Sequence, residues 1–331
     1  MVLSDFWFLV AFTVVIVGLL VVDLVVINRD MGAPNMRQSA LWCAFWVSLA
    51  LLFSVYVFIS RGRTAGLEFL TGYIIEYSLS VDNLFVFFML FTYFAVPAAY
   101  QRRVLFWGIL GAFLMRGTMI ALGAALIKQF HWILYLFGAF LVFTGFKMLR
   151  SGDEEVEPEK NPVVRFARQR LPITPSYVGE KFFVRQGRAL LATPLFIVLL
   201  SVETTDLVFA VDSIPAIFAV TQDPFIVYTS NVFAILGLRS LYFLLRDMAT
   251  RFHYLKIGLS VVLMFIGVKM LVMDIFKIPT ELSLAVVATV LSTSVVVSIL
   301  RPPAEPHELP VEHAAEASGA SPQLSAGRAE E

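Results

Sequence analysis

Two stretches of the chain carry carboxylates inside otherwise apolar sequence. Glu76 and Asp82 lie in the first, and Glu203, Asp206 and Asp212 lie in the second. A charge at the centre of a membrane costs about 2.5–3.5 kcal/mol on insertion scales, so each of these residues needs a reason to be there. Their polar neighbours are oxygen donors: Ser78, Ser80, Asn83, Thr204, Thr205 and Ser213. Carboxylate and amide oxygens suit magnesium, calcium or manganese better than soft metals.

These stretches and their neighbours hold more negative than positive charge. Arg116 and Arg239 lie near the middle of two further apolar blocks, so five carboxylates face two arginines. We expect the arginines to neutralise and orient the acids. Because purely structural ion pairs tend toward neutrality, the excess suits a divalent cation, exchangeable protons, or both. Asp23, in the first apolar block, is a further charge-pairing candidate. The alternative is that some polar residues only hold helices together.

The elements that position these residues are long apolar blocks. Of 331 residues, 59% are hydrophobic. Nine blocks have the length of about 20 residues that a membrane-spanning helix needs. They are 6–27, 39–59, 67–95, 105–127, 132–149, 191–220, 225–245, 255–273 and 280–300. The predicted fold class is therefore an all-α membrane protein. The blocks 67–95 and 191–220 are long and acidic, so bent or interrupted helices are expected there.

Two segments of the chain resemble each other, 67–149 and 191–273. The matched positions keep their order: Glu76 with Asp206, Asp82 with Asp212, Asn83 with Ser213, Arg116 with Arg239, Gly145 with Gly267, and Lys147 with Lys269. Each segment has three predicted spans, an odd number, so the second copy should cross the membrane in the opposite sense. Inverted repeats of this kind place the substrate at their interface, near the middle of the membrane.

Helical phase divides the acids into two groups. On an unbroken helix Glu76 and Asn83 share one stripe, whereas Asp82 and Asp212 lie about 120° away from the acidic stripe of their own helix. For these two aspartates to join the site, the backbone must unwind, or else they face a different neighbour. Pro215 removes one backbone hydrogen bond near Asp212, which favours unwinding in the second copy only.

The remaining segments are assigned from the distribution of Lys and Arg. These residues gather in alternate loops, which places the N-terminus outside and the C-terminus in the cytoplasm. Residues 1–66 then hold two spans, 150–190 form a cytoplasmic loop, 274–300 hold the last span, and 301–331 form a disordered cytoplasmic tail. Within the loop, the sequence from 182 to 191 predicts a short hairpin around Gln186.

Several function classes are excluded or disfavoured. A net charge of zero gives no electrostatic case for nucleic acid. One cysteine, Cys43, excludes an intrachain disulfide, and the four histidines lie at block edges or in the tail, so a buried zinc or copper site lacks ligands. The chain has no nucleotide-binding Gly-x4-Gly-Lys-Ser/Thr motif and no nucleophile motif. We therefore expect no enzyme activity and no cofactor. An intramembrane hydrolase using two aspartates is the weakest alternative.

At these residues the chain resembles the TerC family of integral membrane proteins, which includes the Alx proteins. The resemblance covers roughly residues 1–300. It rests on these matches: Asp23-Leu24, Glu76 to Asn83, the run from Glu203 to Ala216, the run from Asp223 to Asn231, Gly237 to Phe243, and Phe265 to Leu271. No acidic position departs from the family pattern.

The resemblance implies manganese export across the bacterial inner membrane. It carries over Glu76, Asp82, Glu203, Asp206 and Asp212 as metal positions, with Asn83 and Ser213 as weaker ones. The family has also been linked to tellurium resistance, to metal loading of secreted enzymes beside the protein-export machinery, and to membrane-protein insertion.

The function predicted from the sequence is therefore export of a hard divalent cation, with Mn²⁺ as the expected substrate. Export from a negative interior costs about 2.3 kcal/mol per charge per 100 mV, and proton exchange on the carboxylates is the economical source of that energy. The alternative is a membrane scaffold that hands metal or nascent chains to a partner through its loop and tail.

Overall fold

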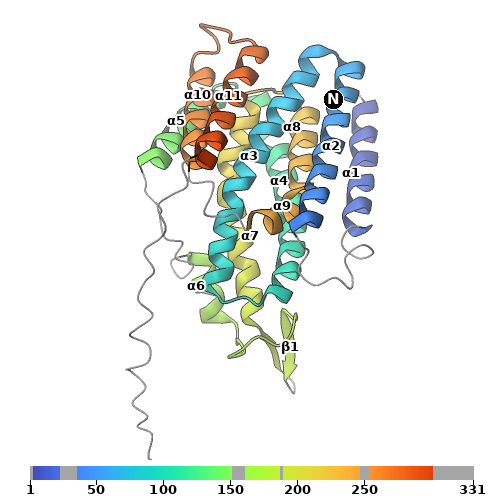
Figure 1. The fold of residues 1–331 in the computed structure, drawn as a ribbon, viewed down its shortest axis with the longest axis vertical. Coiled ribbons are helices and arrows are strands. Elements are labelled where there is room, and N and C mark those ends of the chain that lie inside the picture. Colours follow the sequence, from blue (N-terminus) through green and yellow to red (C-terminus); the bar gives the residue numbers. More distant parts are fainter. Residues whose placement is uncertain (1–2, 23–35, 151–160, 187–188, 247–253, 301–331) are drawn as a thin grey trace, which may run out of the picture.

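The computed structural model describes residues 3–22, 36–150, 161–186, 189–246 and 254–300. Over these ranges the chain is a bundle of helices with one short hairpin (Figure 1). The elements are α1 Leu3–Val22, α2 Met36–Arg61, α3 Arg63–Tyr93, α4 Ala98–Gln129, α5 Ile133–Arg150, α6 Pro162–Arg170, β1 Phe183–Gln186, β2 Ala189–Ala192, α7 Pro194–Phe218, α8 Pro224–Leu236, α9 Leu238–Arg246, α10 Leu255–Leu271 and α11 Thr280–Leu300.

The helices confirm the predicted all-α membrane class. Within the described residues, α2, α3, α4, α5, α7 and α11 are each long and apolar enough to cross a membrane, and the bent pair α8 and α9 would make a seventh span. The apolar part of α1, Trp7–Leu19, and the 17 residues of α10 are shorter. A helix lies at each of the nine predicted blocks, but nine crossings stay a prediction.

The two longest acidic blocks form uninterrupted helices. α3 has 31 residues and α7 has 25, so an interruption is wrong for both, and a bend, the other possibility, stays a prediction. At 1.5 Å per residue α3 is about 46 Å long, against a hydrocarbon core of about 30 Å. Its excess length is therefore accommodated by tilt or by projection beyond the core. Pro215 lies in the last turn of α7, where the loss of one hydrogen bond leaves the rest of the helix intact.

The break lies instead in the seventh predicted block. α8 and α9 meet at Gly237 with a bend of 42°. A Cβ added at Gly237 would lie 3.4 Å from Cε2 of Tyr77 and 3.8 Å from Cβ of Trp46, so α2 and α3 pack closely against the bend. α8 begins at Pro224, and its N-cap Asp223 accepts a hydrogen bond from the backbone N–H of Phe225.

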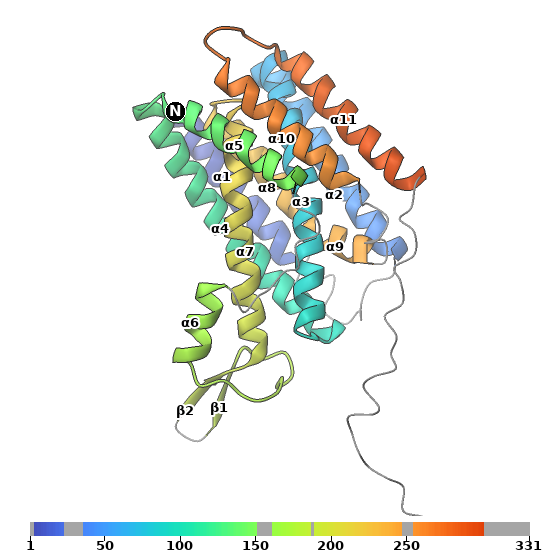
Figure 2. The same ribbon diagram turned by 90° about the vertical axis from the view of Figure 1, so that its left-hand side faces the viewer.

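The two predicted repeats pack against each other pairwise. α4 packs along α7, and α8 packs along α3. α5 and α10 form the most extensive helix pair, and they run in opposite directions (Figure 2). A Cβ at Gly145 would lie 2.7 Å from the carbonyl oxygen of Ser260, and one at Gly267 would lie 2.7 Å from that of Gly138. The close approach of these two backbones therefore depends on glycine at both ends.

Gly267→Ala is expected to destabilise the protein by about 1–3 kcal/mol, as overpacking usually does. The added methyl would meet backbone atoms of α5, which cannot rotate away. Gly18→Ala in α1 is the matched control, because its methyl meets nothing within 4 Å. Thermal unfolding of the detergent-purified variants measures the difference. Equal midpoints for the two variants would show that α5 and α10 are not in close contact.

The loop between α5 and α7 is partly structured. The predicted hairpin is confirmed: β1 and β2 pair antiparallel, from Phe183 with Ala192 to Gln186 with Ala189. The short helix α6 was not expected from the sequence. Its N-cap Asn161 donates a hydrogen bond of 2.8 Å to the Thr204 hydroxyl of α7, which fixes the loop to the bundle. α6 and the hairpin lie together at one end of the bundle, beside the start of α7 (Figure 2). The predicted disordered tail, 301–331, lies outside the described residues.

Candidate functional site

Three charged side chains meet in the interior of the bundle, and we call them the buried triad. They are Glu76 of α3, Arg116 of α4 and Asp206 of α7, which are 0%, 1% and 3% exposed. Nε of Arg116 donates to Oδ2 of Asp206 at 3.2 Å, and its Nη2 donates to Oδ1 at 2.9 Å. The third nitrogen, Nη1, is in direct contact with Oε1 of Glu76. One arginine thus joins acids from both halves of the chain.

The charge of the triad is unbalanced. With all three groups ionised, two carboxylates face one guanidinium, and the triad carries one net negative charge. Arginine is suited to this position because its planar fork binds one carboxylate with two parallel hydrogen bonds and still has a donor left. Buried charges without full compensation attract a further cation or a proton.

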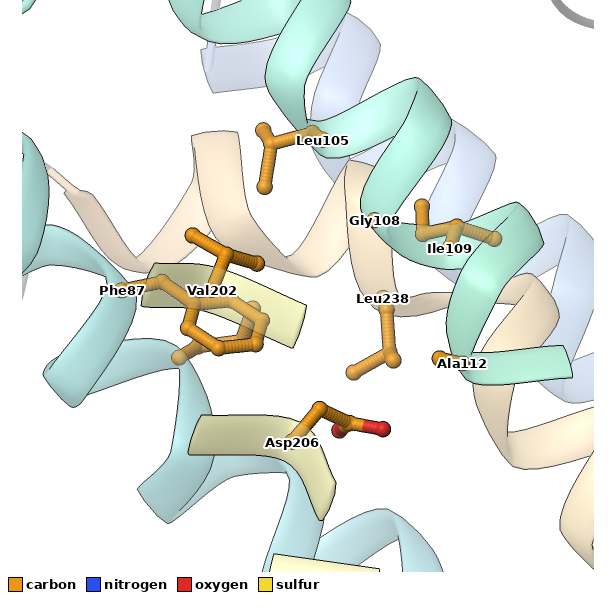
Figure 3. A pocket seen from close by; sticks show the side chains of 9 residues that line it. Phe87, Leu105, Gly108, Ile109, Ala112, Val202, Asp206 and Leu238 are labelled. Carbon is orange, nitrogen blue, oxygen red and sulfur yellow. The ribbon is translucent and has the colours of Figure 1, made fainter. Parts of the chain in front are cut away.

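A small cavity adjoins Asp206. It has a volume of about 10 Å³, close to the least that holds one water molecule. It lies between α3, α4, α7 and the start of α9, with Phe87, Val202, Gly108 and Leu238 among its lining residues (Figure 3). Among the described residues that line it, Asp206 is the charged one. The space beside this carboxylate is therefore apolar apart from the acid itself.

Glu203 lies against the backbone of α4. A Cβ added at Gly111 would overlap the Glu203 carboxylate, so glycine at this position is what lets the acid lie against α4. Glu203 is half-buried and stands one turn before Asp206 on α7, within electrostatic range of it. A second carboxylate is thus available close to the triad without being part of it.

Asp212 faces a different neighbour. Its Oδ1 accepts a hydrogen bond of 3.2 Å from the Thr144 hydroxyl of α5, and Lys147 is within electrostatic range. It stands six residues beyond Asp206, about 9 Å along the helix. Of the two possibilities left by helical phase, Asp212 therefore takes the second: α7 does not unwind, and the carboxylate turns to α5.

The other predicted site residues are placed as follows. Ser213 and Asn83 are buried, at 1% and 6% exposure. Arg239 is also buried, at 7%, and its side chain is engaged in contacts. The backbone of Asp82 belongs to α3, but its side chain lies outside the described part of the molecule, as does all of Asp23. Among the described residues, no three His, Cys, Asp or Glu side chains gather closely enough to hold a metal.

Two polar groups were missed from the sequence. Glu68 of α3 shares a hydrogen bond with Thr221 and lies within electrostatic range of Asp223 and Lys269. It is the first acid of the predicted block 67–95, and that position alone could have marked it. Asn231 of α8 is 1% exposed, and neither polar atom of its amide has a hydrogen-bond partner among the described residues.

Comparisons with known proteins agree on one family. Residues 61–304 match the family described as "Integral membrane protein TerC family". The chain is 52% identical over 296 residues to the Escherichia coli (strain K12) "Putative membrane-bound redox modulator Alx", covering 87% of this chain and 92% of that protein. It is 49% identical over 290 residues to the "Uncharacterized membrane protein STKORF319" of Myxococcus xanthus, covering 88% and 91%. No solved structure gives a significant match.

Proposed function

The chain belongs to the TerC family of integral membrane proteins, and we propose that it exports a hard divalent cation, Mn²⁺ in the first place, from the cytoplasm. The observation that carries the proposal is the buried triad. Its two acids come from the two halves of the chain, and its single arginine leaves one negative charge uncompensated in full burial. A site with these properties attracts a cation and links its binding to the relative position of the two halves.

The proposal includes an inverted repeat, in which 67–149 and 191–273 are related by a two-fold axis in the membrane plane. Supporting it, the contacts between α5 and α10 are reciprocal. The sequence match pairs Gly145 with Gly267, and by the same offset Gly138 with Ser260. Gly145 contacts Ser260, and Gly267 contacts Gly138, as expected across a two-fold axis. An axis along the membrane normal would make α5 and α10 parallel, whereas they are antiparallel.

The substrate is proposed from the donor set. Glu203 and Asp206 are carboxylates one turn apart on α7, and Asp206 opens onto the cavity beside it. Oxygen ligands of this kind suit Mn²⁺, Mg²⁺ or Ca²⁺. The cation would enter beside these two acids while Arg116 keeps its contact with Glu76. Rocking of one repeat against the other would then expose the site to the opposite side of the membrane.

Export needs an energy source, and proton exchange fits the site. Moving a divalent cation out of a negative interior costs about 2.3 kcal/mol per charge per 100 mV. Carboxylates that release the cation outside can take up protons there and return them to the cytoplasm. The proposed setting is the bacterial inner membrane, with the N-terminus outside. The name of the Alx relatives refers to redox modulation, whereas Cys43, this sequence's one cysteine, is buried.

A cellular assay tests the function. In bacteria that lack their own manganese exporters, the parent chain is expected to lower cell-associated manganese and restore growth in excess Mn²⁺. Glu203→Gln should fail to do so at equal expression, because it deletes a carboxylate while keeping the side-chain size. Glu180→Gln, in the exposed loop, is the control and should protect like the parent. If Glu203→Gln protects the cells from Mn²⁺, Glu203 is not part of the transport site. If the parent chain does not protect them, the proposed function is refuted.

A further inference from the structure

Among the buried polar side chains that have no hydrogen-bond partner in the described residues, three come from the helices around the buried triad. They are Asn231 of α8, Ser80 of α3 and Ser213 of α7, which are 1%, 0% and 1% exposed. A buried donor or acceptor left unpaired costs about 1–3 kcal/mol. Three such residues in one region point to a ligand that would satisfy them.

The packing of α3 against α7 brings two of these residues to the level of Glu76. A Cβ at Gly72 on α3 would lie 3.4 Å from Ile217 on α7. The later residues of α3 share the Asp206 cavity with the earlier residues of α7, so the two helices run in opposite directions. Glu76 lies four residues after Gly72 on α3, and Ser213 lies four residues before Ile217 on α7. Because the helices are antiparallel, Glu76 and Ser213 are at the same level. Ser80 follows one turn after Glu76, on the same face of α3.

Asn231 faces the same region from α8. Its neighbour Ser230 lies against α3, 3.0 Å from the position of a Cβ at Gly72. Tyr228 lies against α4, 3.5 Å from a Cβ at Gly117. At 100° per residue, the direction of Asn231 falls between these two contacts. Its amide therefore points into the space between α3 and α4, where the buried triad lies.

The internal repeat gives an independent indication of the same position. Aligned on Arg116 and Arg239, the repeat matches Gly108 to Asn231. Aligned on its acidic motifs, which precede a gap, it matches Glu76 to Asp206. Gly108 and Asp206 line one cavity. By the same symmetry Asn231 should lie beside Glu76, and its amide side chain would occupy the space that Gly108 leaves open beside Asp206.

We propose that Glu76, Asn231, Ser80 and Ser213 form a second subsite for the transported cation, separated from the Asp206 cavity by Arg116. This inference rests on the proposed transport function. One carboxylate, one amide oxygen and two hydroxyls are hard ligands for a divalent cation that keeps some of its water. The subsite adds Asn231, a neutral oxygen ligand, to the carboxylates. Counting charged residues in the sequence cannot identify such a ligand.

The geometry of Arg116 explains how the two subsites would be used in turn. Nε and Nη2 hold Asp206, and Nη1 alone contacts Glu76. The guanidinium can therefore release Glu76 while both hydrogen bonds to Asp206 persist, which frees the Glu76 subsite for the cation. When the arginine returns to Glu76, the cation is expelled from that subsite. Arg116 thus acts as a tethered cation that competes with the substrate.

Asn231→Leu is the sharpest test, because leucine keeps the size and removes both polar atoms. If Asn231 binds the cation, Mn²⁺ affinity of the purified protein should fall about 10- to 100-fold in calorimetry. The metal-free unfolding temperature should stay equal or rise, because an unpaired polar group has been removed. Asn231→Asp retains an oxygen and should bind Mn²⁺ at least as tightly as the parent. Ser39→Ala removes an equally buried, unpartnered hydroxyl on α2 and serves as the control.

Each outcome decides one question. If the parent transports Mn²⁺ and Asn231→Leu binds it as tightly as Ser39→Ala does, the subsite is refuted and the transport function stands. If the parent neither binds nor transports Mn²⁺, the proposed function itself fails. Should Asn231→Leu not fold, the double variant of Ser80→Ala with Ser213→Ala takes its place. Unchanged Mn²⁺ affinity in that variant would overturn the proposal, and weakened affinity would support it.

Discussion

Replacing Arg116 by glutamine is expected to destabilise the folded protein by about 3–5 kcal/mol, which is the usual cost of leaving a buried charge without its partner. Glu76 and Asp206 are both fully buried, and the arginine is the group that contacts both. In the variant two carboxylates would share a dry space without a positive charge. We expect a lower yield of folded protein and a large drop in its thermal unfolding temperature in detergent.

The control separates lost charge balance from lost packing. Adding Glu76→Gln and Asp206→Asn to Arg116→Gln neutralises the triad and should recover most of the stability. Lys128→Gln, at the exposed end of the same helix, should change the unfolding temperature little. An Arg116→Gln protein as stable as the Lys128→Gln protein would mean that the triad is not held together by its charges.

Much of the fold followed from composition and spacing. Long apolar blocks predicted the helices, and the turn residues around Gln186 predicted the hairpin. The acids of the triad stood out because a charge inside an apolar block is costly and therefore rare. These predictions succeeded because each depends on one local property of the sequence. The helix α6 was missed because a nine-residue helix of mixed apolar and basic residues has no comparable signal.

The grouping of the acids could not be predicted from the sequence. Helical phase placed Asp212 away from the acidic stripe, but only packing shows that Thr144 of α5 is its partner. Counting all carboxylates together suggested one centre with an excess of three negative charges. In the described residues they are divided instead: Glu76 and Asp206 share Arg116, and the Glu203 side chain of α7 lies against the backbone of α4. A count of charged residues gives only the net charge, whereas the side chains in contact with each acid determine which charges interact.

The positions of the helix breaks show a similar limit. Pro215 suggested unwinding, but a proline in the last turn of a helix disturbs little beyond that turn. The bend occurs instead at Gly237, which packs against Tyr77 of α3. Asn231 lies in one of the runs that resemble the family, but the sequence alone assigns it no role. A buried amide becomes notable only when its partners can be searched for in three dimensions.

Asp206→Asn should reduce cation transport to near background while leaving the protein folded. The asparagine oxygen can still accept a hydrogen bond from Arg116, and the remaining pair of Arg116 and Glu76 is neutral. The substrate, however, loses a carboxylate ligand beside the cavity, which should lower the rate of transport by about 10- to 100-fold. Glu281→Gln, an exposed acid at the start of α11, is the matched control and should transport normally.

The most direct test of the account is Mn²⁺ flux in proteoliposomes that contain only the purified chain. We predict saturable Mn²⁺ movement in the parent and in Glu281→Gln, competition by Mg²⁺ or Ca²⁺, acceleration by an opposing proton gradient, and flux near the protein-free background in Asp206→Asn. Background flux in the parent under every gradient would contradict the transport function and favour a scaffold. Parental flux in Asp206→Asn would show that the cation crosses without using the buried triad.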